Sequence, residues 1–275
     1  MTDTDWMRPG EDREPVDLRT DQPHPARVYN YLLGGKDYFE ADARAARQSL
    51  EKNPDALIPP RTNRDFMTRA VAFLAKEYGI KQYLDIGTGI PASPNVHETA
   101  QAVHPDARIV YVDNDPIVLN HARALLRGTP QGETKYFEAD IRRPEDIVER
   151  AAKVLDPSVP IALSLISVLH FIGEDENPQG IVDRLLAPWP SGSYVAISHL
   201  TDEFNPEMWA FIAKRYEGTD TKMIFRTRDR GMQFFEHLSP VEPGLVMVHR
   251  WRPEPGDDAY QDGQVACWGC VARKP

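Results

Sequence analysis

Short apolar runs alternate with helical patterns from about residue 80 onward. The apolar runs are bounded by Gly, Pro, Asp and Asn, and their lengths are typical of buried β-strands. We predict strands at 82–86, 108–113, 134–139, 161–169 and 193–199. We predict helices near 95–103, 116–127, 145–155 and 178–187. This alternation is typical of a parallel sheet with crossover helices, so the sequence predicts an α/β fold.

The N-terminal part of the chain has a different pattern. Residues 1–22 are acidic, contain proline and show no apolar period, which predicts a disordered tail. Residues 23–79 show helical periodicity and predict a helical extension that precedes a main domain at 80–275. Two pairs have the spacing of capping boxes and predict the starts of the second and third helices, namely Asp37 with Glu40 and Thr62 with Asp65.

Two late apolar runs, LVMVHRW at 245–251 and VACWGCVAR at 265–273, predict an antiparallel hairpin at one edge of the sheet. Cys267 and Cys270 form a CxxC in the second run. In a strand these two positions point to opposite faces, and no second CxxC is present to complete a zinc site. We therefore expect two buried thiols and no metal.

The loop after the first strand is rich in glycine, in the stretch YLDIGTGIPASP at 83–94. Gly87, Gly89 and Ala92 satisfy the pattern GxGxxG/A, and Asp113 ends the second strand, which together are typical of a dinucleotide site. However, Asp85 lies inside the strand end, where its charge repels a pyrophosphate and attracts a cationic amino group. The next helix is also expected to start only near residues 93–94, too late to aim its N-terminus at a diphosphate.

S-adenosylmethionine fits these residues better, because it has an ammonium group and no phosphate. We expect Asp85 to accept from that ammonium, and Gly87 and Gly89 to let the backbone approach the ligand. Asp113 is placed for the ribose hydroxyls, Asp140 for the adenine amino group, and the Ile141 amide for a ring nitrogen. Structural alternatives remain: Asp113 as a helix cap, Asp140 as a surface turn and Gly89 as a bend.

The chain from about residue 22 to its end resembles a bacterial family of class I S-adenosylmethionine-dependent methyltransferases, long catalogued as a domain of unknown function. The resemblance rests on PHPARVYNYLLGGKDYFEAD, YLDIGTGIPASPNVHETAQ, IVYVDNDPIVLNHARALL, YFEADIRRPEDI and RTRDRGMQFFEHLSPVEPGLVMVHRWRP. It implies a Rossmann-like, seven-stranded, mostly parallel sheet with an antiparallel C-terminal strand. It also implies cofactor binding through Asp85, Gly87, Gly89, Asp113, Asp140 and Ile141. Pro91 stands where many class I enzymes carry a third glycine, which leaves the exact path of the loop open and the cofactor assignment unchanged.

Four further residues complete the predicted cofactor site: Asn114, Gly34, Gly35 and Arg64. The glycine pair suggests a hinge for an N-terminal lid in which Tyr29, Tyr31 and Phe39 wall off the methyl group. The alternative is that the glycine pair is only a flexible connector between two helices and that the aromatic residues are ordinary core residues. Arg27 and Arg64 suit the methionine carboxylate, with solvated helix-face arginines as the alternative.

Methyl transfer is an in-line displacement, and a protonated acceptor must also lose a proton. His170 and His199 follow or end the fourth and fifth strands and are the candidate bases. Their alternative is a histidine that bonds the backbone at a strand end.

The formal charge of −10 and the absence of an NPPY-like tetrapeptide after the fourth strand argue against a nucleic-acid substrate. We expect a small-molecule acceptor, with a protein acceptor still open. A non-catalytic cofactor binder and a nicotinamide oxidoreductase are the alternative classes. No apolar run has the length of a membrane span and the N-terminus lacks a signal-peptide pattern, so we expect a cytoplasmic protein without a membrane partner.

Overall fold

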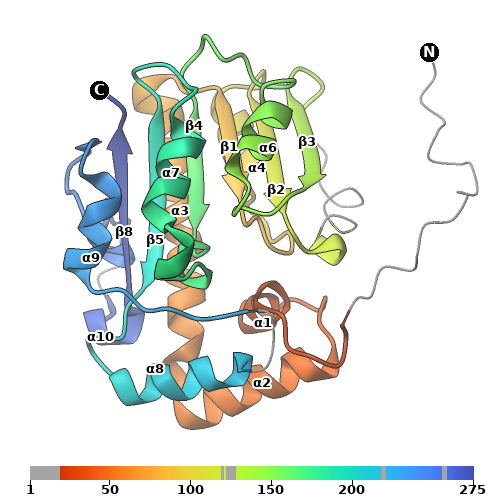
Figure 1. Cartoon of the computed structure of the whole chain (residues 1–275), viewed down its shortest axis with the longest axis vertical. Coiled ribbons are helices and arrows are strands. Elements are labelled where there is room, and N and C mark those ends of the chain that lie inside the picture. The colour runs from red at the N-terminus through yellow and green to blue at the C-terminus, as the bar shows by residue number, and fades with distance from the viewer. Residues whose placement is uncertain (1–18, 119–120, 122–127, 218–220, 256–258) are drawn as a thin grey trace, which may run out of the picture.

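The computed structural model describes residues 19–118, 121, 128–217, 221–255 and 259–275 (Figure 1). All five predicted strands form: β1 (Gln82–Ile86), β2 (Arg108–Asp113), β3 (Glu133–Glu138), β4 (Ala162–Ile166) and β5 (Tyr194–Leu200). Four match the predicted bounds within one residue, whereas β4 ends three residues before its predicted end at 169. Three more follow late in the chain: β6 (Ser239–Pro240), β7 (Val246–Met247) and β8 (Cys267–Arg273). The predicted disordered tail lies almost wholly outside the described residues.

These strands form one sheet in the order β3-β2-β1-β4-β5-β8-β6, with β7 also paired to β8. Strands β1 to β5 are parallel, and β8 is antiparallel to β5, as predicted. The count is eight rather than seven because two two-residue strands, β6 and β7, both pair with β8. The predicted strand at 245–251 is therefore mostly wrong: after Met247 the chain forms the 3-10 helix η7 (Val248–Arg250).

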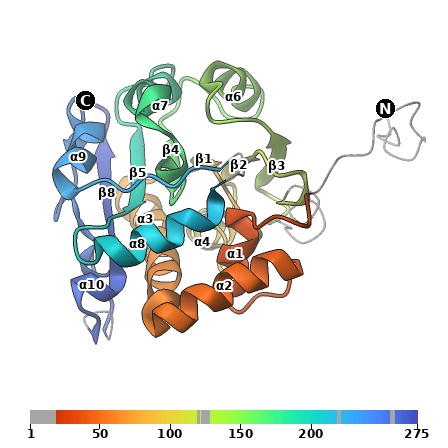
Figure 2. The same cartoon turned by 60° about the horizontal axis from the view of Figure 1, so that its bottom comes forward.

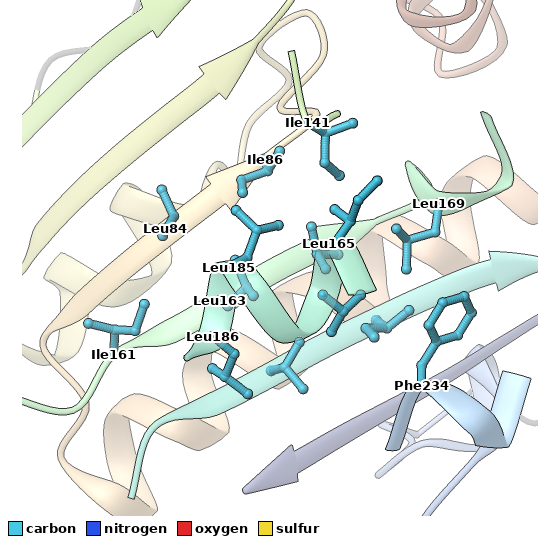
Figure 3. Packing of buried hydrophobic residues seen from close by; sticks show 14 of the residues in the cluster. Leu84, Ile86, Ile141, Ile161, Leu163, Leu165, Leu169, Leu185, Leu186 and Phe234 are labelled. Atoms are coloured by element: carbon cyan, nitrogen blue, oxygen red, sulfur yellow. The ribbon is translucent and has the colours of Figure 1, made fainter. Parts of the chain in front are cut away.

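Helices cover both faces of the sheet (Figure 1). On one face lie α6 (Pro144–Ala151) and α7 (Pro178–Leu186), and on the other lie α3 (Ile58–Tyr78) and α4 (Val96–Val103). Figure 3 shows the first core, in which Leu84 and Leu163 from the sheet pack against Leu185 of α7. The predicted helix at 116–127 lies mostly outside the described residues.

The second core joins α3 to the sheet. Phe66, Met67 and Leu74 of α3 pack with Tyr83 of β1 and Val271 of β8. The packing therefore does not separate residues 23–79 from the rest of the chain. Cys267 belongs to this core and Cys270 to the opposite one, so the two thiols lie on opposite faces as expected. Burial raises the pKa of each thiol to about 12.

A third group of helices lies beyond the carboxyl ends of the parallel strands (Figure 2). It consists of α1 (Pro25–Leu32), α2 (Glu40–Lys52) and α8 (Pro206–Ala213), with the 3-10 helices η2 (Pro54–Leu57) and η5 (Lys214–Tyr216). Shorter elements complete the chain: η3 (Leu169–Phe171), η4 (Glu174–Glu176), α9 (Arg228–Met232), η6 (Gln233–Phe235) and α10 (Asp262–Val265).

Both predicted capping boxes are wrong. Phe39 is the N-cap of α2, and its amide donates to Asp42 Oδ2 at 2.8 Å, so the capping carboxylate comes from two residues beyond Glu40. Thr62 lies inside α3, where its hydroxyl donates to Ile58 O at 2.9 Å. Proline fits the first helical turn, and Pro59 and Pro60 let α3 start earlier than its polar pattern indicates.

No helix among the described residues is long and apolar enough to cross a membrane. The same residues contain no cluster of three or more His, Cys, Asp or Glu side chains arranged to hold a metal ion.

Candidate active site

A cavity of about 740 Å³ lies between the carboxyl ends of β1 to β4 and the helices α1, α2 and α8. Its volume is within the range of ligand sites, which span about 300–1,000 Å³. Nine of the predicted site residues line it: Arg64, Asp85, Gly87, Gly89, Asp113, Asn114, Asp140, Ile141 and His170. Three do not: Gly34, Gly35 and His199.

The glycine loop turns sharply at the end of β1. Gly87 has φ +73°, and its amide donates to Val112 O of β2 at 2.8 Å. A Cβ atom at Gly87 would lie 2.6 Å from Val168 Cγ2, so only glycine fits between the loop and the segment after β4. Gly89 has φ +66° and open space around it, which leaves its backbone accessible to a ligand.

Asp113 ends β2 and is fixed by two backbone amides. Gly89 N donates to its Oδ2 at 2.8 Å, and Asp115 N donates to its Oδ1 at 2.9 Å. The side chain is only 7% exposed, and burial raises its pKa to about 6, against the opposing effect of these amides. The helix cap that was the alternative role for Asp113 is provided by Asp115 instead, because Asp115 Oδ1 accepts from Ile117 N at 2.8 Å.

Asp85 is buried at the end of β1, and its burial raises its pKa while the charge of Arg64 acts in the opposite direction. Arg64 lies in α3 and donates to Ala92 O and, at 2.6 Å, to Pro94 O. Arg64 therefore ties α3 to the glycine loop and brings a positive charge to the cavity wall. It is not a solvated helix-face residue.

The turn after β3 carries Asp140 and Ile141. Asp140 Oδ1 accepts from Arg142 N at 2.9 Å, which closes the turn, and Arg142 Nη1 lies 3.4 Å from the same oxygen. Arg142 also pairs with Glu176 of η4, another residue that lines the cavity. The Ile141 side chain is buried in the first core, and this packing holds the turn against the sheet (Figure 3).

The loop that follows Gly89 is long, as expected. Helix α4 begins at Val96, and Glu98 Oε2 accepts from Asn95 N at 2.5 Å. A carboxylate already occupies the N-terminus of α4, and this charge repels a diphosphate. The local structure thus disfavours the dinucleotide alternative and suits a cofactor without phosphate.

His170 lies in η3 directly after β4 and is 2% exposed. Its Nδ1 atom is buried and has no hydrogen-bond partner among the described residues. Burial, together with the charge of Arg226, lowers the pKa of His170 to about 3. The ring is therefore neutral at pH 7 and weakly basic.

His199 is fully buried in β5 and does not reach the cavity. Its Nδ1 lies 2.7 Å from Leu200 O, and its Nε2 accepts from Arg226 Nη1 at 2.8 Å. The ring stacks on Trp268, with centroids 4.9 Å apart. The geometry therefore supports the backbone-bonding alternative for His199 and does not support a role as catalytic base.

Only part of the predicted lid lines the cavity. Tyr29 of α1 does, and its hydroxyl donates to Pro60 O at 2.8 Å. Tyr31 packs edge-on against Tyr38 outside the cavity, with ring centroids 4.8 Å apart. The Gly34–Gly35 pair lies outside the lining, and closure of the helices over the cofactor stays a prediction.

Helix α8 and the 3-10 helix η5 form a wall of the cavity that was not predicted from the sequence. Met208, Trp209 and Ile212 of α8 line the cavity, as do Arg215 and Tyr216 of η5. The position of α8 beside α2 depends on contacts between residues more than 150 positions apart in sequence, such as Asn53 Nδ2 to Met208 Sδ at 2.9 Å. No local pattern predicts such a contact.

Three acids at the ends of successive parallel strands, around a glycine loop, define a cofactor-binding site of the Rossmann-like methyltransferase type. Residues 11–275 match the sequence model of the S-adenosyl methyltransferase family, so the chain belongs to that family. The protein is accordingly an S-adenosylmethionine-dependent methyltransferase, and S-adenosylmethionine is its cofactor. No curated protein matches the chain.

Solved structures agree with this assignment. A DUF574 family protein from Streptomyces avermitilis is 47% identical, with 94% of this chain and 100% of that chain covered and a TM-score of 0.91. A candidate methyltransferase from Thermobifida fusca is 37% identical, and the match covers 96% of this chain and 99% of that chain with a TM-score of 0.85. A methyltransferase from Anabaena variabilis shares the fold alone, because it is only 14% identical. That match covers 85% of this chain and 95% of that chain, with a TM-score of 0.52.

Proposed function

We propose that this chain transfers the methyl group of S-adenosylmethionine to a small-molecule acceptor bound in the same cavity. The observation that carries the proposal is the convergence of Asp85, Asp113 and Asp140 on one cavity that also extends under α1, α2 and α8. The cytoplasmic location stays a prediction.

The residues present fit the cofactor. Asp113 is the proposed acceptor for the ribose hydroxyls, Asp140 for the adenine amino group and Asp85 for the ammonium group. Gly87 and Gly89 allow the close approach of the backbone that these contacts require. When bound, the cofactor supplies an electrophilic methyl group on a sulfonium centre.

His170 is the proposed polar contact of the acceptor. It follows β4 directly and lines the cavity, and it is neutral at pH 7 because burial lowers its pKa. A neutral imidazole accepts a hydrogen bond from an acceptor O–H or N–H and so orients a lone pair of that acceptor. Its weak basicity favours this positioning role over early proton removal, since an efficient general base has a pKa near the operating pH.

The position of the cavity supports a small acceptor. It lies between the strand ends and a layer of three helices, rather than on an open face (Figure 2). The formal charge of −10 is unfavourable for a nucleic acid. Methylation of a folded protein or of RNA, found in an acceptor screen, would contradict this part of the proposal.

Calorimetric titration with S-adenosylhomocysteine tests the cofactor half of the proposal. We expect micromolar binding to the wild type, and binding at least about 10-fold weaker to Asp113→Ala. Asp183→Ala, which removes an exposed acid from α7, serves as the matched control and should bind as the wild type does. Equal affinity of all three proteins would exclude Asp113 from the cofactor site.

A further inference from the structure

The cavity is divided by charge. Its carboxylates all lie near the strand ends, in the part proposed for the cofactor: Asp85, Asp113, Asp115, Asp140 and Glu176. The part formed by α1, α2, η2, α8 and η5, here called the helical chamber, is lined by no carboxylate among the described residues. The described helices of the chamber contribute two arginines to its lining, Arg27 and Arg215. Arg27 has a carboxylate partner, whereas Arg215 of η5 has none among the described residues.

Arg215 differs from three other arginines that line the cavity, Arg27, Arg64 and Arg142, each of which has a described partner. Arg27 pairs with Asp42 at 3.0 Å, Arg142 pairs with Glu176, and Arg64 donates to two carbonyls of the glycine loop. Arg215 has no ion pair with a described residue.

The environment of Arg215 leaves its charge only partly compensated. Its Nη1 donates to Phe211 O at 2.7 Å, and its Cζ lies 3.9 Å from the centroid of the Phe211 ring. Its Nε is buried and has no hydrogen-bond partner among the described residues. Lys52 Nζ lies 5.3 Å from the same ring, so a second cation adds to the positive potential at this end. A half-buried cation without a counter-ion favours an anionic ligand.

Most of the remaining chamber lining is apolar, although Tyr29, Ser49 and Tyr216 also belong to it. Trp209 is 5% exposed and lines it together with Met208 and Ile212 of α8. Leu32 and Leu33 line it from the end of α1. Methionine side chains adapt to irregular apolar shapes, so this surface suits a hydrophobic ligand body. A protonated amine would find no carboxylate among the described residues that line the chamber.

We propose that the helical chamber binds a largely apolar acceptor that carries one carboxylate, and that Arg215 pairs with that carboxylate. This inference names the acceptor class of the proposed methyl transfer and rests on that function. The pairing places the anionic end of the acceptor at η5 and leaves its opposite end for the strand-end part of the cavity.

Three probes of one shape test the charge preference: 2-naphthoate, 2-naphthalenemethanol and 2-naphthylmethylammonium. Their binding is measured by calorimetry on the full chain at pH 7.5, with and without saturating S-adenosylhomocysteine. We expect 2-naphthoate to bind at least about 10-fold more tightly than the ammonium probe. Arg215→Gln should remove this preference, while Arg61→Gln, which changes an exposed arginine of α3, should retain it.

The outcomes separate this inference from the proposed function. If S-adenosylhomocysteine binds but the three probes bind equally, or the ammonium binds best, the acceptor class is wrong and the cofactor half stands. Unchanged naphthoate affinity in Arg215→Gln would also overturn the inference. If S-adenosylhomocysteine does not bind, the proposed function fails, and the probes still report on the chamber. S-adenosylhomocysteine affinity in Arg215→Gln should match the wild type, which shows that the variant is folded.

Discussion

The raised pKa of Asp113 predicts that cofactor affinity depends on pH. In the proposed site the ionised carboxylate of Asp113 accepts from the ribose hydroxyls, and burial raises the pKa of this carboxyl to about 6. Its charge is therefore lost as the pH falls through 6, and affinity should fall with it. If only the ionised form binds, the dissociation constant scales with one plus the ratio of protonated to ionised carboxyl. That factor is about 11 at pH 5 and about 1.1 at pH 7, so binding weakens about 10-fold.

The assay is calorimetric titration with S-adenosylhomocysteine at pH 5.0, 6.0, 7.0 and 7.5. The free amino and carboxyl groups of the ligand keep their charges over this range. Asp113→Asn should bind weakly at every pH and lose most of the dependence; Asp183→Asn should retain it. A wild-type dissociation constant that stays constant from pH 5 to 7.5 would refute the reasoning. The same slope in Asp113→Asn would assign the titration to another group, such as Asp85.

Further substitutions test other parts of the site. Gly87→Ala should weaken S-adenosylhomocysteine binding at least about 10-fold in calorimetry, because its Cβ would meet Val168 and its φ is +73°; Val168→Ala in the same chain should restore part of the affinity. His170→Ala should lower the turnover of a screened acceptor by about 100-fold with cofactor affinity unchanged, because the acceptor loses the contact that orients its lone pair; unchanged turnover would remove His170 from the mechanism. Arg226→Met should lower the free energy of unfolding in urea by about 3–5 kcal/mol, because the buried acceptors Leu169 O, Ile172 O and His199 Nε2 lose their charged donor; a loss below about 1 kcal/mol would contradict this.

The strand-end residues were predictable because their positions follow from local patterns. Asp85 lies one residue before the end of the apolar run of β1, and Asp113 ends that of β2. Each run predicts a strand, and the position of the acid in it predicts that the acid lies at the carboxyl edge of the sheet. His199 shows the limit of this logic. It also lies at a strand end, but Arg226 reaches its Nε2 from 27 residues later, and Trp268 of the antiparallel β8 covers its ring. Sequence alone does not tell a cavity-facing histidine from one that is bonded in the core.

The acceptor side of the cavity was less predictable, because contacts between residues distant in sequence decide which side chains line it. Arg215 lies in a polar segment after an apolar helix and has the pattern of an ordinary surface residue. Its role in the cavity wall depends on the packing of α8 beside α2 across a long stretch of sequence. Arg215 forms no ion pair with a described carboxylate, and this property of the folded arrangement is what makes its charge informative.

The placement of Cys267 and Cys270 has a practical consequence for spectroscopy. Both thiols are buried, and each pKa is about 12, so the thiolate fraction at pH 7.5 is on the order of 10⁻⁴ or less. Maleimide dyes and thiol-reactive spin labels react with thiolates, so we expect them not to react with either native cysteine. A cysteine introduced on α1 or α8 can therefore be labelled in the wild-type background. Distances between such labels would follow any movement of the helical layer as the cofactor binds.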